Sequence, residues 1–527
     1  MDQSEAPLLE ALAEYHRLNR YGFTPPGHRQ GRGADSRTLE IMGSDPFRSD
    51  VLSTAGLDDR KSSGGYLSKA EELMAEAVGA DKAFFSTCGS SLSVKASILA
   101  VTKGNGDLLI GRDAHKSVVA GIILSGLQPR WIRPQWDRDL HIAHPPSPEE
   151  VEKMWQRYPD AAAALITSPT PYGTCADIQK IAEICHSRGK PLIIDEAWGA
   201  HLPFHDRLPT WAMDAGADIC VVSVHKMGMG FEQGSIYHLQ GDLVDPVRLS
   251  QCADLLSTTS ANVMIYAAID AWRRQMVQEG QGLLEKALTL ADSVRGDIDA
   301  MDGLHVLGPE LIKDEASHDF DPLHVLIDVG ELGISGYQAA DWLRTNCRID
   351  VGLNDHRRIE ATLSQSDDEE TSERLLAGLR QLIDAAPQMP EPSKVQLPEP
   401  EDLEMETVVL PRDAFFGPVE NVPAEEAAGR IAAEQLTPYP PGVPAILPGE
   451  KINAAVVDYL RTGVAAGMVL PDPADPSVKT IGWWRTSGTS SPPYPPGDEA
   501  GTVADEKPGV GCWYLPEQYP EYAKERL

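Results

Sequence analysis

Short apolar runs alternate with helical patterns between residues 66 and 240. The segments "YLSKAEELMAEAVGA" and "DIQKIAEICHSRGK" have the spacing of amphipathic helices, and Gly79 is placed to end the first. Apolar runs that predict buried strands are "KAFFSTCG", "DLLIGRDAH", "AAALITSPTPYG", "PLIIDEAWG" and "DICVVSVHK". Strands alternating with helices predict an α/β domain whose mostly parallel sheet is covered by helices on both faces.

The pattern changes after about residue 275. "HVLIDV" predicts a strand, and "SGYQAADWLRTN" and "SERLLAGLRQLIDAA" predict helices, which together indicate a smaller α+β domain. "PQMPEPSKVQLPEPEDLEME" has the Pro and Glu content of a linker. We therefore expect an N-terminal segment (1–55), a large domain (56–290), a small α+β domain (291–388), a C-terminal domain (389–470) and a Pro- and Gly-rich tail with little regular structure (471–527).

Each predicted strand of the large domain ends in a polar cluster. The clusters are Cys88–Ser91, Arg112–His115, Ser168–Thr170, Asp195–Glu196 and Ser223–Lys226. Because the carboxyl ends of parallel strands line one edge of a sheet, these clusters are expected to converge on one crevice, where ligands of such folds bind.

Charge and cysteine content narrow the class of protein. The 527 residues contain 46 Lys and Arg against 79 Asp and Glu, a net charge of −33, which argues against nucleic acid or an anionic membrane as the main partner. The seven cysteines are scattered and form no CxxC pair, as expected for reduced thiols and no metal site. No segment has the apolar length of a signal peptide or a membrane span, so we expect a soluble cytoplasmic protein.

Lys226 and Asp195 together indicate pyridoxal phosphate chemistry. That cofactor needs a lysine for the Schiff base and a carboxylate that keeps its ring nitrogen protonated. Taken alone, Lys226 is explained as well by a strand that has reached water, and Asp195 by a helix cap or strand-end turn. Their occurrence at the ends of successive predicted strands favours the catalytic interpretation.

A phosphate cradle and a stacking ring are also present among the strand-end clusters. In "STCGSSLS", Gly89, Ser90 and Ser91 open a helix whose backbone N–H groups could hold a phosphate, although serine caps helices in many other settings. His115 could stack on a flat ring, whereas a lone histidine is more often structural. Neither alternative predicts the whole set jointly.

At this point the chain resembles the ornithine/lysine/arginine decarboxylases of the bacterial fold-type I group, which have the aspartate-aminotransferase-like fold. The resemblance covers about residues 21–450. It is carried by "TPPGHRQG", "GLDDRKSSGGYLSKAEELMAEAVGADKAFFSTCGSS", "GRDAHKSVVAG", "TSPTPYGTCADIQKIAEICH", "DEAWGAHLPFH", "SVHKM", "STTSAN" and "PYPPGVPAILPGE".

The resemblance implies a role for each motif residue. Lys226 would bind pyridoxal 5'-phosphate covalently, Asp195 would pair with its ring nitrogen, and His115 would stack on its ring. The residues implied around the phosphate, the Schiff base and the cofactor hydroxyl are Ser90, Ser91, Thr170, Ser223 and His225. Thr258 and Thr259 resemble a segment that reaches the phosphate of the neighbouring subunit, which implies a homodimer with active sites at its interface.

The chain departs from the family pattern at three places. Trp198 stands where the family usually has a histidine after "DEA"; it could still pack on the cofactor, but substrate selection is expected to change. "HKMGMGFEQGS" differs from the Thr- and Leu-rich loop usual after the lysine. The N-terminal wing domain of the larger members is absent, so their decameric assembly is not expected.

The expected activity is α-decarboxylation of a basic amino acid to an amine and carbon dioxide, a reaction of polyamine biosynthesis. Two other possibilities stay open: another fold-type I reaction, such as transamination or oxidative decarboxylation, and a non-catalytic homologue. Retention of both Lys226 and Asp195 argues against the last. Candidates for reading the distal cation of lysine, arginine or ornithine are Asp413, Glu420 and Glu450, although a surface role fits each of them as well.

Overall fold

The computed structural model describes residues 1–52, 57, 65–102, 104, 106–315 and 317–485. These residues belong to one compact unit, Met1–Arg485. The part of the expected tail from residue 486 onward lies outside the described residues, as do Cys512 and most of the motif segment "GLDDRKSSGG". No helix among the residues that the structure describes is long and apolar enough to cross a membrane.

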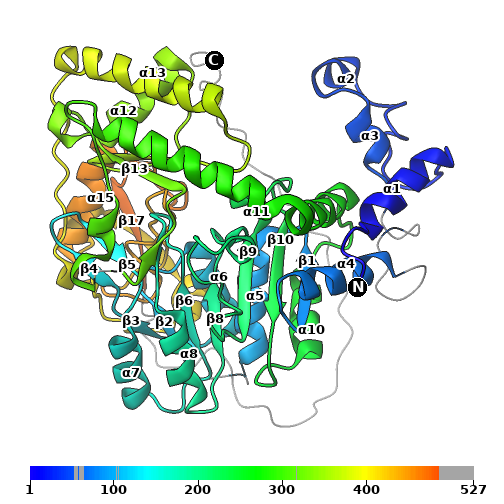
Figure 1. The fold of residues 1–527 in the computed structure, drawn as a ribbon. Coiled ribbons are helices and arrows are strands. Elements are labelled where there is room, and N and C mark those ends of the chain that lie inside the picture. The colour runs from blue at the N-terminus through cyan, green and yellow to red at the C-terminus, as the bar shows by residue number, and fades with distance from the viewer. Residues whose placement is uncertain (53–56, 58–64, 103, 105, 316, 486–527) are drawn as a thin grey trace, which may run out of the picture. The chain divides into compact units, whose positions relative to one another are not determined.

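A seven-stranded sheet forms the centre of the large domain (Figure 1). Its strands, in spatial order, are β1 (Lys82–Ser86), β10 (Ser235–Leu239), β9 (Ile219–Ser223), β8 (Leu192–Asp195), β6 (Ala164–Thr167), β2 (Asp107–Gly111) and β3 (Gln128–Ile132). Within this sheet only β10 runs antiparallel to its neighbours. The predicted mostly parallel sheet is therefore present, and β3 and β10 are the strands that the sequence pattern did not identify.

Both faces of this sheet are buried. Successive strand residues point into different cores: Ile194 packs in one core and Ile193 in the other. The first core is covered by α4 (Tyr66–Ala77), α7 (Pro148–Arg157), α8 (Ile178–His186) and α11 (Val263–Asp299), and the second by α5 (Gly89–Val101), α6 (Lys116–Ser125) and α10 (Pro246–Leu256). Burial on both sides explains why these strands are continuous apolar runs and do not alternate.

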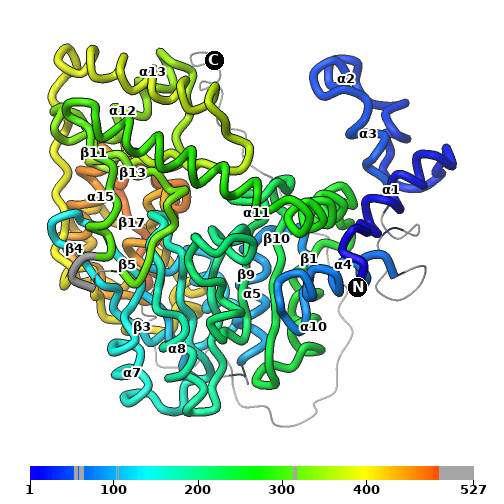
Figure 2. Tube along the Cα trace, viewed as in Figure 1, coloured from blue at the N-terminus to red at the C-terminus, as the bar shows by residue number. Residues whose placement is uncertain are grey.

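The 37-residue helix α11 leads from the large sheet to a smaller antiparallel sheet (Figure 2). The order of the smaller sheet is β11 (His305–Val306), β13 (His324–Asp328), β15 (Arg358–Thr362) and β14 (Leu353–Asn354), with α12 (Gly336–Trp342) and α13 (Glu369–Ala385) beside it. Leu288 of α11, Ile327 of β13 and Leu379 of α13 share one core with the large domain. Strand β13 and helices α12 and α13 lie where the sequence predicts them.

The C-terminal region has a core of its own. Its elements are α14 (Pro411–Phe416), β16 (Val419–Pro423), α15 (Ala454–Ala466) and β17 (Thr480–Trp484), with β16 and β17 paired antiparallel. Strand β17 corrects the expectation of an irregular tail from residue 471. Ile481 and Val478 are buried in the same core as Leu460, which fixes this part of the chain despite its proline-rich surroundings.

The N-terminal segment forms α1 (Pro7–Arg17), α2 (Ser36–Met42) and α3 (Asp45–Ser49). Helix α1 packs on α11, where the buried Asp270 carboxylate accepts a hydrogen bond of 2.8 Å from the Leu8 backbone. Helices α2 and α3 project away from the large sheet (Figure 1). The short elements that complete the fold are α9 (Val224–Met227), β4 (Gln135–Asp137) paired with β5 (Ile142–His144), and β7 (Thr174–Cys175) paired with β12 (Asp319–Phe320).

The remaining ordered turns are short helices. They are the 3-10 helices Leu202–Phe204, Pro309–Glu315, Gly330–Leu332, Ala386–Gln388, Pro400–Leu403 and Ala424–Glu426, and the π-helix Leu343–Cys347.

Candidate active site

Lys226 lies in the one-turn helix α9, directly after β9. Its Nζ is 4.3 Å from the centre of the Trp198 ring. Burial lowers the pKa of Lys226 to about 8, although the nearby charge of Asp195 favours the protonated form. The side chain is thus held inside the protein and not in open solvent, and it can lose its proton close to neutral pH.

Asp195 is the last residue of β8, the strand next to β9. The side chain is 3% exposed, and its Oδ1 has no hydrogen-bond partner among the residues that the structure describes. Burial raises the pKa of Asp195 to about 6, while the charge of Lys226 and the backbone N–H of Ala197 act in the opposite direction. Near pH 7 the two side chains therefore carry opposite charges at adjacent strand ends.

His115 caps the N-terminus of α6 at the end of the β2 segment. Its Nδ1 lies 3.2 Å from the Ser117 backbone N and 2.9 Å from the Ser117 hydroxyl. Burial, together with the positive charge of Lys226, lowers the pKa of His115 to about 4. The capping alternative is therefore real, but the same ring is neutral and electrostatically coupled to Lys226. A Cβ built on Gly442 would lie 2.8 Å from its Nε2, so only glycine allows that loop to approach the ring so closely.

The first turn of α5 contacts the end of β9. The Ser223 hydroxyl donates a 2.7 Å hydrogen bond to the Ser90 hydroxyl. Gly89 has φ +74°, in the left-handed region that favours glycine, and the preceding Cys88 makes no side-chain cap. The positive end of a 13-residue helix therefore faces Ser223 without a side-chain cap, although the Gly89 N–H donates to the Gln233 carbonyl oxygen. Ser91 is exposed, and the structure does not place it in this contact.

Two other predicted residues are held within their own loops. The Thr170 hydroxyl lies 2.7 Å from that of Thr174, and Thr170 is buried at the edge of a large cavity. His225 Nδ1 lies 3.2 Å from the Gly234 carbonyl oxygen, and burial lowers its pKa. Neither contact excludes a ligand from the remaining ring nitrogen or hydroxyl lone pairs.

Behind Trp198 lies a buried polar network that the sequence analysis missed. The edge of the His324 ring meets Trp198 at 5.2 Å between ring centres. His324 Nδ1 lies 3.2 Å from Glu360 Oε1, and His201 Nε2 lies 2.9 Å from Asp321 Oδ2. Burial disfavours the charged imidazole, but Glu360 and Asp321 outweigh it and raise the pKa of His324. This network joins β13 and β15 of the small domain to the Trp198 loop.

The only available signal for these residues was "AWGAH" and "FDPLH", in which polar residues interrupt apolar segments. Periodicity could not pair them, because they are more than 100 residues apart in the chain. The fold brings them together, so the sequence alone could not have shown that they support Trp198.

Thr258 and Thr259 follow α10 and are exposed, and the Thr258 hydroxyl accepts only a local hydrogen bond from the Ser260 backbone. Among the candidates for the distal cation, Asp413 and Glu420 are also exposed. Glu450 is buried and forms an ion pair of 3.2 Å with Arg112, so its carboxylate already has a cation. The surface alternative therefore fits Asp413 and Glu420, and a structural role fits Glu450.

The residues present fit pyridoxal phosphate. Asp195 offers an unpartnered buried oxygen for a protonated ring nitrogen, and Lys226 offers an amine with a lowered pKa. The uncapped start of α5, beside Ser90 and Ser223, is suited to a phosphate. These features lie at the ends of adjacent segments of one sheet, as the cofactor requires.

Comparison with protein families gives two adjoining matches. The major domain of Orn/Lys/Arg decarboxylases matches residues 6–370, and the C-terminal domain of the same family matches residues 399–472. The chain belongs to the Orn/Lys/Arg decarboxylase family. This confirms the family, and with it the expected class of enzyme, a decarboxylase.

Curated members of the family match nearly the whole chain. The arginine decarboxylase of Halalkalibacterium halodurans is 36% identical over 91% of this chain and 97% of its own length. The arginine decarboxylase of Bacillus subtilis is 35% identical over 91% and 98% of the two chains. The solved constitutive lysine decarboxylase of Escherichia coli has 20% sequence identity and a TM-score of 0.74 over 91% of this chain and 80% of its own. That likeness confirms the expected fold.

Proposed function

We propose that this decarboxylase uses pyridoxal 5'-phosphate to convert arginine into agmatine and carbon dioxide. The observation that supports the chemistry is the half-buried Lys226, whose pKa is lowered and which lies with Asp195 at the ends of adjacent parallel strands. Arginine is preferred in the proposal because the arginine decarboxylases named above match at 35–36% identity, whereas the lysine decarboxylase LdcA of Pseudomonas aeruginosa matches at 25%.

Each residue has a defined task in this proposal. Bound at the strand ends, the cofactor supplies an electron sink for the bond between Cα and the carboxylate. Asp195 keeps a proton on the ring nitrogen, and the neutral His115 packs on the ring face. Lys226 binds the cofactor in the resting enzyme and, with His225 as the alternative, returns a proton to Cα. Ser90 and Ser223 hold the phosphate.

The visible spectrum and the products test the proposal. The purified protein should be yellow, and borohydride should bleach it by fixing the cofactor to Lys226, which peptide mass spectrometry can locate. Arginine, lysine and ornithine should then be assayed in parallel for carbon dioxide and amine. An oxo acid as product would indicate transamination, and hydrogen peroxide would indicate oxidative decarboxylation. A colourless protein that cannot be reconstituted with pyridoxal phosphate would refute the cofactor assignment.

The homodimer is also a proposal. Thr258 and Thr259 are exposed in the described chain, as expected if they serve a neighbouring subunit. The projecting segment that contains α2 exposes Phe23 (87%), Ile41 (68%) and Met42 (56%), an apolar surface that a second copy could cover. The cytoplasmic location expected from the sequence stays a prediction.

Mixing variants tests whether two chains share a site. Lys226→Ala and a double variant, Thr258→Ala with Thr259→Ala, should each be poorly active. Co-refolded, heterodimers would contain one site with all the lesions and one with none, so activity should exceed the sum of the two parents. Simple additivity would show that each site is built from a single chain.

A further inference from the structure

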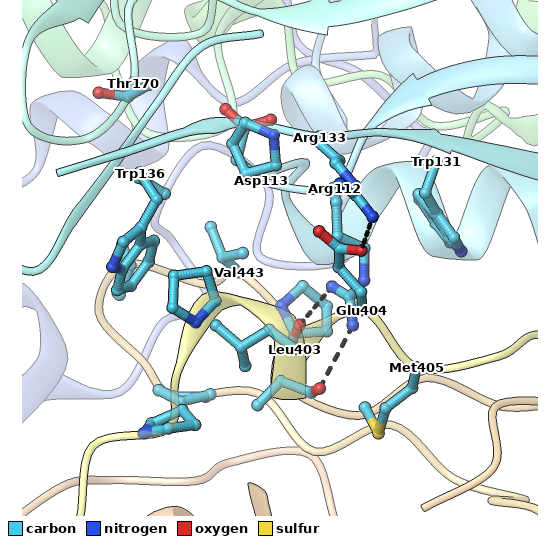
Figure 3. A pocket seen from close by; sticks show the side chains of 18 of the residues that line it. Arg112, Asp113, Trp131, Arg133, Trp136, Thr170, Leu403, Glu404, Met405 and Val443 are labelled. Atoms are coloured by element: carbon cyan, nitrogen blue, oxygen red, sulfur yellow. Dashed lines mark hydrogen bonds and ion pairs between the residues drawn. The ribbon is translucent and has the colours of Figure 1, made fainter. Parts of the chain in front are cut away.

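A cavity of about 890 Å³ lies beside the strand-end site. It is bordered by the ends of β2 and β3, by β4 and by residues 397–407 and 438–445. In Figure 3, Thr170 and Asp113 lie on one side of the cavity, Leu403 lies on the other, and Glu404 lies beside Arg133. Since Asp113 is two residues before His115, this cavity borders the proposed cofactor site but does not contain Lys226 or Asp195.

Asp113 is an unusual lining residue because it is buried without a partner. The residue is 6% exposed, and neither carboxylate oxygen has a hydrogen-bond partner among the residues that the structure describes. A Cβ built on Gly111 would lie only 2.5 Å from Asp113 Oδ1, so glycine at position 111 makes room for the carboxylate. Burying a carboxylate in this way is costly unless a partner of opposite charge is supplied.

Three arginines of the cavity wall bind groups other than Asp113, and only Arg112 Nε among their buried nitrogens has no partner among the described residues. Arg112 donates to the Pro444 carbonyl and pairs with Glu450 at 3.2 Å. Arg133 pairs with Glu404, as Figure 3 shows, and Arg130 pairs with Asp107 at 2.8 Å. Burial raises the pKa of Asp113 to about 7, and it outweighs the backbone N–H of Asp113 itself and the charge of Arg112, which both favour the ionised carboxylate.

Aromatic rings form much of the remaining wall. Trp131 and Tyr158 already stack with Arg112 and Arg130. Trp136 and Tyr337 line the same cavity, and a flat ring attracts an organic cation at its face. An unpartnered carboxylate beside such rings is the arrangement that recognises ammonium and guanidinium groups.

We propose that Asp113 is the anionic end of a binding subsite for a small organic cation, an alkyl ammonium or a guanidinium. Two sources share that chemistry: the distal group of the amino acid substrate, in which case the subsite rests on the proposed function, and a free amine, in which case it does not. The experiment below separates them.

Equilibrium titration of the holoenzyme with agmatine and putrescine reads the subsite without turnover. Asp113→Asn should weaken their binding about tenfold, because a charge-assisted hydrogen bond is lost. The matched control is Glu406→Gln, which removes an exposed carboxylate from the same cavity and should change binding less than twofold. Uncharged 1,4-butanediol should not bind. Equal amine binding by wild type and Asp113→Asn, or no binding by wild type, would overturn the proposal.

Steady-state kinetics then assigns the source. If the substrate's distal group occupies the subsite, Asp113→Asn raises KM for arginine about tenfold with kcat little changed, and agmatine competes with arginine. If a free amine occupies it, KM is unchanged and a non-competitive inhibition by amines is lost. Absence of decarboxylation by wild type would refute the proposed function alone, since the titration does not need turnover. Should Asp113→Asn fail to fold, Trp136→Leu decides: undiminished amine binding in that variant overturns the proposal.

Discussion

Asp195 and Asp113 are buried carboxylates at the same edge of one sheet, but only Asp195 lies beside a lysine at the end of the adjacent strand. Asp195 ends β8 beside Lys226, whose charge lowers the pKa that burial raises. Asp113 follows β2 in a spacious cavity, where the nearby Arg112 is committed to Glu450. The pKa of Asp195 is raised to about 6 and that of Asp113 to about 7.

The two carboxylates therefore suit different roles: Asp195 suits a bound cofactor, and Asp113 suits a ligand that binds reversibly. In the proposed function Asp195 pairs with the ring nitrogen of the bound cofactor, so its charge does not depend on which substrate is present. A carboxylate that binds a cation reversibly must be left unpaired in the free protein, at a cost in stability. The predictions below test the two halves of this comparison.

The largest effect is expected at Lys226. Lys226→Ala removes both the covalent link to the cofactor and a proton donor to Cα, so kcat should fall by roughly 10³-fold or more. Lys286→Ala, which changes an exposed lysine of α11, is the control and should retain full activity. Carbon dioxide release measures both variants, and a fully active Lys226→Ala protein would refute the catalytic assignment.

Asp195→Asn should have the next largest effect. An amide cannot stabilise the protonated ring nitrogen, so we expect kcat to fall by roughly 10²-fold while cofactor stays bound. Absorbance of the bound cofactor separates the two outcomes. Turnover at the wild-type rate would show that Asp195 acts only as a strand-end cap.

Part of the site could be predicted from the sequence pattern. Lys226, Asp195 and Ser223 were identifiable because each directly follows an apolar run, and the edge of a parallel sheet brings such positions together. Strands β3 and β10 were missed because "QPRWI" and "SIYHL" mix polar with apolar residues and do not form a continuous apolar run. The same pattern included Asp113 among the strand-end residues but could not show its lack of a partner.

Contacts between distant segments explain the remaining misses. Glu450 was a candidate for the substrate cation until the fold placed Arg112, which lies 338 residues earlier, against it. The network of His324 and Glu360 behind Trp198 depends likewise on packing of strands β13 and β15 against the Trp198 loop. Periodicity describes local burial, and it carries no information on which polar side chains meet across the fold.

Asp113 should make stability depend on pH in a defined direction. Its folded pKa of about 7 lies above the ordinary value of 3.8, so the folded protein binds the proton more tightly than the unfolded chain. The destabilisation is therefore full above about pH 7 and fades as the pH falls toward 3.8. Asp113→Asn lacks this penalty and should be more stable at pH 8, on the order of 2–4 kcal/mol.

Thermal midpoints of Asp113→Asn and wild type, without amines, check this between pH 4.5 and 8. The difference should shrink as the pH falls, and saturating agmatine at pH 8 should also reduce it by stabilising wild type. A difference that is independent of pH would mean that the Asp113 carboxylate has an unrecognised partner.

The smallest expected effect is at Trp198, whose ring lies between Lys226 and the His324–Glu360 network. Its ring lies 4.3 Å from Lys226 Nζ on one side and meets His324 on the other. Trp198→His restores the residue usual in the family but leaves space beside Lys226, so kcat/KM for arginine should fall by about tenfold or less. Trp198→Phe is the matched control because it keeps an aromatic face, and its kcat/KM for arginine should lie between those of wild type and Trp198→His.

The ratio of kcat/KM for arginine to kcat/KM for lysine is the informative measurement. If Trp198 shapes substrate choice, this ratio shifts in Trp198→His more than in Trp198→Phe, whereas equal losses for both substrates would limit Trp198 to positioning Lys226.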